Sequence, residues 1–165
     1  MKIIKIILIA FLIIAIGYAI ILYFTLKPKT RDVSQLSPYF EIIGKDLIVQ
    51  REAKLVRNLP AFVYENPYLI QENDQPVYEG ITEIYTIPVG TVIKIDKAQF
   101  IKNGVSGFTH SVVFGTLEIA GQGLKSFEYV WGNQAITLDA GKPLEFSFPM
   151  AIWQTTSDDA TYEFK

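Results

Sequence analysis

The sequence predicts a small all-β domain that follows a single N-terminal transmembrane helix. Residues 6–26 are an unbroken run of 21 uncharged, mostly apolar side chains. Beyond them, short runs alternate apolar and polar residues with the period of two that is typical of strands. Turn-forming residues separate these runs about every ten positions, and no amphipathic helix pattern intervenes. We therefore expect an antiparallel β-barrel or β-sandwich.

The N-terminal run is long enough to cross a membrane. It begins at Ile6 and ends at Leu26. At about 1.5 Å per residue, a helix of this length spans roughly 30 Å, which is the thickness of the hydrocarbon core of a bilayer. Lys2 and Lys5 precede the run, and Lys27 follows it. We expect an uncleaved signal anchor that crosses the cell membrane once, with the lipid bilayer as its partner.

A cleavable export signal is the alternative interpretation of this segment. The segment Gly17-Tyr18-Ala19 places two small residues, Gly17 and Ala19, at a spacing that suits a signal peptidase. Cleavage after Ala19 would, however, leave the apolar residues 20–26 at the new N-terminus. The run is also longer than the roughly 7–15 apolar residues of a typical export signal, which favours the anchor.

The charge distribution bears on orientation and on the class of partner. The basic residues on the two sides of the helix nearly balance, so the positive-inside rule separates the two orientations only weakly. Five of the 15 Lys and Arg residues lie within the first 31 positions, whereas all 17 Asp and Glu residues follow them, so the remainder carries a net charge of −7. Because basic residues resist export more than acidic ones do, we expect an extracytoplasmic C-terminal domain. This acidic balance argues against nucleic-acid binding, which requires a cationic face.

The chain divides into four parts by composition. We expect a short tail over residues 1–5, the transmembrane helix over 6–26, a basic and polar juxtamembrane stalk over 27–38, and a globular β-rich domain over 39–165. Aromatic residues make up 13% of the chain, and we expect Trp131 and Trp153 in the domain core. The chain contains no cysteine, which excludes disulfide bonds, thiolate metal sites and lipoprotein attachment.

The strands of the domain follow from alternation and from turn residues. Asn103-Gly104 indicates a hairpin, because both residues tolerate positive φ, and residues 44–46 and 121–123 indicate further turns. Alternation places His110 on one face with Val112, and places Trp131 on one face with the aromatic residues before it. The expected strands are residues 39–43, 47–57, 81–87, 91–96, 108–114, 116–119, 126–131 and 144–148.

One nine-residue segment resembles a known type of module. Residues 87–95, with the sequence Ile-Pro-Val-Gly-Thr-Val-Ile-Lys-Ile, resemble the beginning of a strand in bacterial SH3-like modules. The resemblance implies an SH3-like barrel among the candidate topologies. The Asn-Val-Arg-x-Gly opening of those modules is absent, so the resemblance implies no cell-wall ligand.

Candidate catalytic residues are few. His110 is the only histidine, and a catalytic role would require carboxylates such as Glu128 to converge on it. A lone histidine on a strand is more often structural. Asp158, Asp159 and Glu163 form an acidic group near the C-terminus, but they lack the spacing of an EF-hand and are expected to be solvated. We therefore expect no catalytic residue, no cofactor and no metal site.

The segment expected to carry function is residues 58–80, the longest stretch without alternation. Three prolines restrict its backbone, so aromatic rings on it would lose little conformational entropy on binding. Phe62, Tyr64, Tyr68 and Tyr78 are the candidate partner-binding residues. The alternative is that these rings belong to edge strands and fill the core.

Two functions from different classes are consistent with these features, and an immunity-type or inhibitory protein is a third possibility that the sequence does not separate from the first. The first is a non-catalytic binding or assembly module that is tethered to the membrane as an accessory protein of the cell envelope, with a membrane or envelope protein as its partner. Tethering raises the effective concentration of the domain toward such a partner. The second is a membrane-tethered hydrolase or metal-binding enzyme that uses carboxylates and His110.

Overall fold

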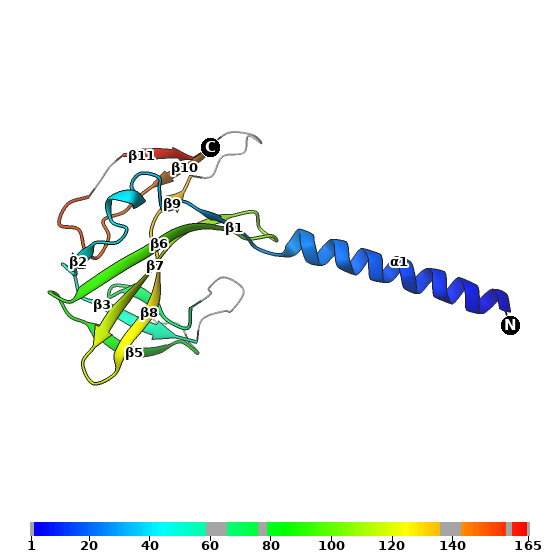
Figure 1. The fold of residues 1–165 in the computed structure, drawn as a ribbon, viewed down its shortest axis with the longest axis horizontal. Coiled ribbons are helices and arrows are strands. Elements are labelled where there is room, and N and C mark those ends of the chain that lie inside the picture. Colours follow the sequence, from blue (N-terminus) through cyan, green and yellow to red (C-terminus); the bar gives the residue numbers. More distant parts are fainter. Residues whose placement is uncertain (1, 59–65, 76–78, 136–142, 158–159, 165) are drawn as a thin grey trace.

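The computed structural model describes residues 2–58, 66–75, 79–135, 143–157 and 160–164. A long helix projects from a β-rich domain (Figure 1). In chain order the elements are α1 (Lys2–Leu26), β1 (Lys29–Asp32), the 3-10 helix η1 (Tyr39–Glu41), β2 (Asp46–Ile48), β3 (Ala53–Arg57), β4 (Leu69–Glu72), β5 (Thr82–Ile87), β6 (Val92–Lys102), β7 (Thr109–Ile119), β8 (Gly123–Val130), β9 (Asn133–Gln134), β10 (Leu144–Ser147) and β11 (Thr161–Phe164).

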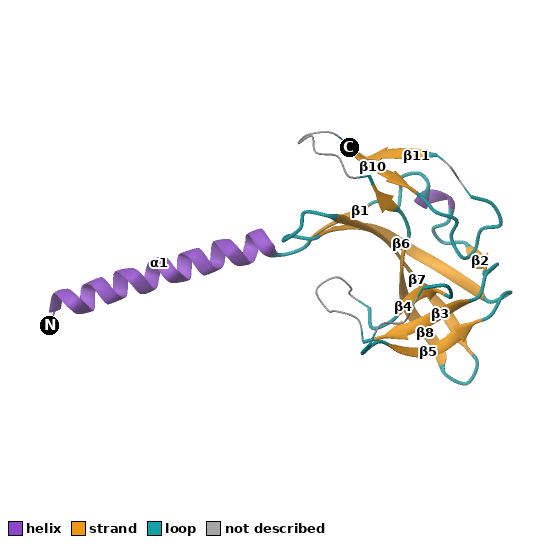
Figure 2. Ribbon diagram, turned by 180° about the vertical axis from the view of Figure 1, so that it is seen from behind, coloured by secondary structure: helices purple, strands orange, loops and turns teal. Residues whose placement is uncertain are grey.

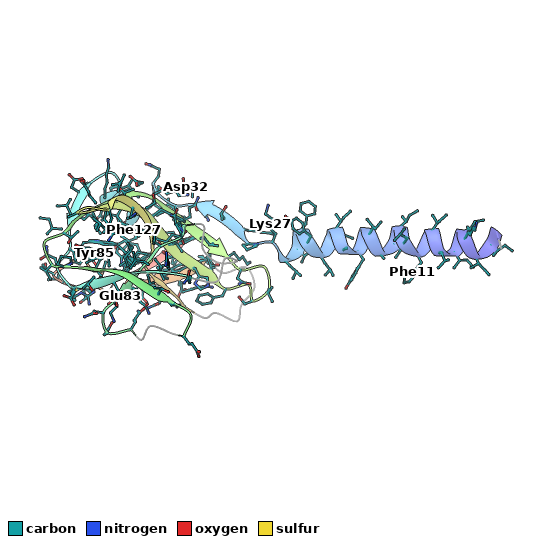
Figure 3. The ribbon with its side chains drawn as sticks, turned by 90° about the horizontal axis from the view of Figure 1, so that it is seen from below. Phe11, Lys27, Asp32, Glu83, Tyr85 and Phe127 are labelled. Carbon is teal, nitrogen blue, oxygen red and sulfur yellow. The ribbon has the colours of Figure 1, made fainter. Side chains whose placement is uncertain are left out.

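The helix α1 projects away from the domain and meets it at its C-terminal end (Figure 1). Its apolar part, Ile3–Leu26, has 24 residues and buries none of its length against the described part of the protein. Figure 3 shows the side chains of α1, Phe11 among them, extending away from the helix axis without reaching the domain. The helix is long and apolar enough to cross a membrane, and it is consistent with a signal anchor or a signal sequence.

The larger sheet is mixed and open. Its strand order is β1-β6-β7-β8-β4-β3-β5, and β2 pairs with the far end of β6. Leu69 of β4 pairs with Glu128 of β8 in parallel, whereas the other pairs are antiparallel. The expected all-β region is therefore present, but the described strands do not close into a barrel. The expected purely antiparallel pairing is also wrong, because β8, which follows β4 in the chain after β5, β6 and β7, lies beside β4 and runs in the same direction.

A smaller sheet of order β11-β10-β9 packs on one face of the larger one (Figure 2). Phe100 of β6 stacks on Phe146 of β10, with ring centroids 4.7 Å apart. Phe164 of β11 meets Phe100 edge-on at 4.8 Å. Trp131 and Trp153 lie in the same buried cluster, 2% and 9% exposed, as expected. Aromatic packing thus joins the two sheets into one core.

Two segments differ from the sequence-based expectation. Residues 29–32 of the expected stalk form β1 and pair with β6, and the Val33 backbone N–H donates to the Ala98 carbonyl at 3.0 Å. Residues 39–41, expected to begin a strand, form η1. The reason is the environment of Tyr39, which is fully buried beneath the aromatic cluster. A single turn of 3-10 helix directs the Tyr39 ring into the core. An extended strand over residues 39–43 would instead carry the backbone past the aromatic cluster.

Candidate functional site

A groove lies where β3, β4 and β8 meet, and we call it the Glu72 groove. It consists of two adjoining cavities of about 430 Å³ and 310 Å³. Glu72, the last residue of β4, and Asp74, in the following turn, line both cavities. Leu69, Tyr129 and Pro149 complete the wall of the larger cavity, and Arg51 and Glu52 that of the smaller one.

The carboxylate of Glu72 is held from two sides. Its Oε1 accepts a hydrogen bond of 2.7 Å from the Tyr129 hydroxyl. Its Oε2 lies 3.4 Å from Nη1 of Arg51 in a partly exposed ion pair. Arg51 in turn donates from Nη2 to the backbone carbonyl of Met150. These contacts fix both the carboxylate and the guanidinium on the floor of the groove, so neither has to be ordered when a ligand binds.

Tyr129 acts as a hydrogen-bond donor in this arrangement. Burial raises the pKa of the Tyr129 phenol, and the hydrogen bond to the Glu72 carboxylate raises it further. The phenol therefore remains protonated throughout the physiological range. Tyr129 orients the carboxylate and does not exchange a proton with it.

The rim of the groove is acidic and exposed. Glu52 and Asp74 lie on it, and Nδ2 of Asn73 donates to Oε1 of Glu52 at 3.0 Å. Among the described residues, no group of three or more His, Asp and Glu side chains is placed to hold a metal ion. Carboxylates suit a cationic side chain or a backbone N–H group as a ligand.

The groove involves the segment that the sequence singled out. β4 and the turn after it belong to residues 58–80, and they supply Glu72 and Asp74. Tyr68 is half-buried against the core, and its carbonyl accepts a hydrogen bond of 3.0 Å from the Glu128 backbone N–H. For Tyr68, this position favours the packing interpretation. The other candidate partner-binding residues, Phe62, Tyr64 and Tyr78, lie outside the described residues.

His110 lies far from the carboxylate proposed as its partner. It is half-buried on the face of β7 that carries Val112, as alternation predicts, and its ring meets Phe108 edge-on at 5.0 Å. Burial lowers the pKa of His110 below its ordinary value of 6.5. Glu128 pairs with Phe114, four residues along β7 from His110, a separation of roughly 13 Å at about 3.3 Å per residue. The two side chains do not converge.

Glu128 has a structural position instead. It is fully buried, and its Oε1 accepts a hydrogen bond from the backbone N–H of Asn66. The Glu128 carboxylate therefore fastens the chain before β4 to β8. Of the acidic C-terminal group, Asp158 and Asp159 lie outside the described residues, and Glu163 is exposed on β11 opposite Glu145.

Sequence reasoning missed Arg51, Glu72 and Tyr129 as a group. They are 21 and 57 residues apart in the chain, counted from Arg51 to Glu72 and from Glu72 to Tyr129. No motif links them, since β4 is placed beside β8 only by tertiary pairing. The one local signal was a charged residue, Glu72, two positions after the apolar pair that begins β4. No known protein family, curated protein or solved structure matched this chain in the comparisons.

Proposed function

We propose that this chain is a single-pass membrane protein whose β-domain is a non-catalytic binding or assembly module of the cell envelope. The observation that carries the proposal is the exposure of the 24-residue apolar part of α1, none of which is buried against the described domain. Apolar surface of this extent is unfavourable in water and favourable in lipid. An uncleaved α1 would tether the domain to the membrane, and we infer an extracytoplasmic position for it.

The Glu72 groove supplies the binding surface in this proposal. Its exposed rim carries Glu52 and Asp74, and its floor holds the Glu72 carboxylate in a fixed position. A lysine or arginine of a partner protein would contact the carboxylates of Glu52 and Asp74, while its neighbours cover Leu69 and Pro149 in the larger cavity. Groups that are already ordered lower the entropic cost of such an interface.

Because the domain is tethered, a groove of this size is sufficient to hold a partner protein. Confinement of two proteins to one membrane plane raises their effective concentration, so a modest intrinsic affinity gives a stable complex. The expected partner is therefore another membrane or envelope protein with a basic segment near the bilayer.

Site-specific photo-crosslinking in intact cells tests the anchor and the groove together. A photo-reactive amino acid in place of Asn73, on the rim, is expected to yield a discrete crosslinked product that stays in membranes after washing with alkaline carbonate. The matched control carries the same group in place of Gln122, an exposed residue of the β7–β8 turn, and should not yield this product. Asp74→Lys in the first variant is expected to reduce the product about tenfold, because it replaces attraction by repulsion.

Each part of the proposal has its own contradictory outcome. Release of the protein by carbonate would overturn the anchor. Equal products from positions 73 and 122, or a product insensitive to Asp74→Lys, would overturn the groove as the binding surface. Protection of the domain from protease added to intact spheroplasts would reverse the proposed orientation.

A further inference from the structure

The junction between α1 and the domain is short. α1 ends at Leu26 and β1 begins at Lys29, so only two residues separate the helix from the sheet. The turn between β6 and β7 packs against the end of the helix, because a Cβ on Gly104 would overlap the backbone carbonyl of Leu26. Figure 3 shows Lys27 at this junction. If α1 spans a bilayer, the junction lies in the head-group layer, which is about 5–8 Å thick on each side.

The turn between β6 and β7 presents apolar side chains at this level. Oδ1 of Asn103 accepts hydrogen bonds from the backbone N–H groups of Val105 at 2.8 Å and Ser106 at 3.1 Å, which fixes the shape of the turn. The Val105 side chain is 79% exposed, and Phe108 is 39% exposed. Water is an unfavourable environment for both, whereas the boundary between head groups and acyl chains is a favourable one.

The strands beside the turn present positive charge. Lys29 of β1 lies directly opposite Lys102 of β6, and both are exposed. Like charges at opposed positions of an antiparallel pair repel each other. Within the described ranges, neither lysine makes an ion pair, and Lys27 adds a third exposed positive charge nearby. An anionic surface would remove this repulsion.

We propose that Lys27, Lys29, Lys102, Val105 and Phe108 form a surface that binds acidic phospholipid head groups and holds the domain against the bilayer. We call it the junction surface. It rests on the membrane anchor of the proposed function. The charge of the lysines matches an anionic lipid, and the apolar tip of the turn continues the apolar surface of α1 at the depth where such tips insert. The domain would then keep a fixed tilt, with its groove at a constant height above the membrane.

Fluorescence of labelled single-cysteine variants in lipid nanodiscs tests this surface. The chain has no native cysteine, so Val105→Cys of the full-length protein can carry one environment-sensitive dye. We expect a blue-shifted emission, quenched by nitroxide-labelled lipid, in discs that contain phosphatidylglycerol, and a weaker response in pure phosphatidylcholine. The control is Leu124→Cys, 69% exposed in the β7–β8 hairpin at the end of the domain far from α1 (Figure 1). Its emission should be the same in both lipids.

Charge variants distinguish binding of acidic lipid by these lysines from simple closeness of the domain to the bilayer. Lys29→Gln with Lys102→Gln is expected to lower the ratio of docked to undocked domain about fivefold for each lysine removed. The matched control is Lys45→Gln with Lys94→Gln. It removes two exposed lysines at the other end of β6, Lys94 on β6 itself and Lys45 directly before its partner strand β2, and should leave the ratio unchanged. The melting temperature of the domain in neutral detergent should not fall in the first variant, since the change removes a repulsion.

Failure of this inference is distinguishable from failure of the anchor. Protein that stays in the discs while the dye at position 105 reports water in both lipids would overturn the junction surface alone. Equal losses in the two double variants would also overturn it. Protein that separates from the discs altogether would overturn the anchor and the junction surface together.

Discussion

Ser111 is the centre of a buried chain of hydrogen bonds that joins three distant parts of the sequence. Its hydroxyl donates to the carbonyl of Trp131 and lies 2.6 Å from the Tyr39 hydroxyl. Since Ser111 has a single proton and the carbonyl can only accept, Tyr39 must be the donor in the second bond. Burial raises the pKa of Tyr39 far above its ordinary value, which keeps this proton in place. These hydrogen bonds connect η1 to β7 and to Trp131, the residue after β8.

The order of donors predicts different costs for two substitutions. Tyr39→Phe removes one donor and leaves the bond from Ser111 to Trp131, so we expect a loss of about 1 kcal/mol in the free energy of unfolding. Ser111→Ala leaves a buried phenol without an acceptor and should cost roughly 1–3 kcal/mol. Urea unfolding in detergent, followed by tryptophan fluorescence, measures both. A larger loss in Tyr39→Phe would contradict the assigned direction of the bonds.

Glu128 shows how a single residue can mislead sequence reasoning. Alternation correctly placed it on the face opposite Phe127 and Tyr129, where a polar residue is expected to meet solvent. The chain before β4 covers that face, and the Asn66 backbone N–H supplies a partner, so the carboxylate is buried. No residue near Glu128 in the sequence predicts its contact with Asn66, about 60 residues away.

At the scale of elements, β6 is longer than the strand expected over residues 91–96. Alternation was visible over residues 91–96, with Ile93 and Ile95 on one face, and then stopped. In the structure the pairing with β7 shifts between Ile95 and Lys97, which indicates a β-bulge at Asp96. A bulge adds one residue, so the residues that face the main core after it are Ala98 and Phe100, whereas Ile101 is buried on the opposite face. The strand continues to Lys102 with its pattern inverted.

A close approach in β7 gives a prediction for this part of the sheet. A Cβ on Gly115 would overlap the Lys94 carbonyl and lie 2.7 Å from Cζ of Phe127. Gly115→Ala is therefore expected to lower the free energy of unfolding by about 1–3 kcal/mol, because the neighbouring strands must shift. Gly17→Ala in α1, where nothing lies within 4 Å of the added atom, is the control. Thermal unfolding that is equal in the two variants would contradict the packing around Gly115.

At the scale of the whole molecule, the domain begins closer to α1 than the sequence indicates. β1 adds a strand to β6, Val33 is 1% exposed, and the Ser34 hydroxyl accepts a hydrogen bond of 2.9 Å from the Ala98 backbone N–H. Residues 29–34 are thus part of the fold. The expected stalk was polar because β1 is a short exposed edge strand, and charged side chains are common on such edges.

Two truncations test this boundary. A chain that begins at Lys27 keeps β1 and is expected to unfold in one cooperative transition. A chain that begins at Tyr39, the boundary expected from sequence, loses the bonds to Ala98 and exposes the edge of β6. We expect its melting temperature to be lower by several degrees, or the protein to aggregate. Equal melting temperatures of the two truncated proteins, measured by circular dichroism, would show that residues 27–38 are a free stalk and not part of the fold.

The sequence by itself determined the features that depend on neighbouring residues. These are the apolar helix, the presence of a hairpin after residue 102, the turn at residues 121–123 and the core-facing aromatic side chains of β8. They follow from helix length, from the positive φ that glycine tolerates at positions 121 and 123, and from the period of two. The hairpin turn differs from the expectation in detail, because its positive φ lies at Gly107 and not at Asn103 or Gly104. Each is set within a few residues, so a single sequence suffices to predict it.

Only the tertiary structure decided how the strands combine. The parallel pairing of β4 with β8 makes the sheet mixed and brings Glu72 to Tyr129. The antiparallel pairing of β3 with β4 brings Arg51 to Glu72. The bulge at Asp96, the burial of Glu128 and the inclusion of β1 also depend on partners about 18 to 70 residues away in the chain. Alternation fixes which face a strand buries and carries no information about which strand lies beside it. The groove exists because of those distant pairings.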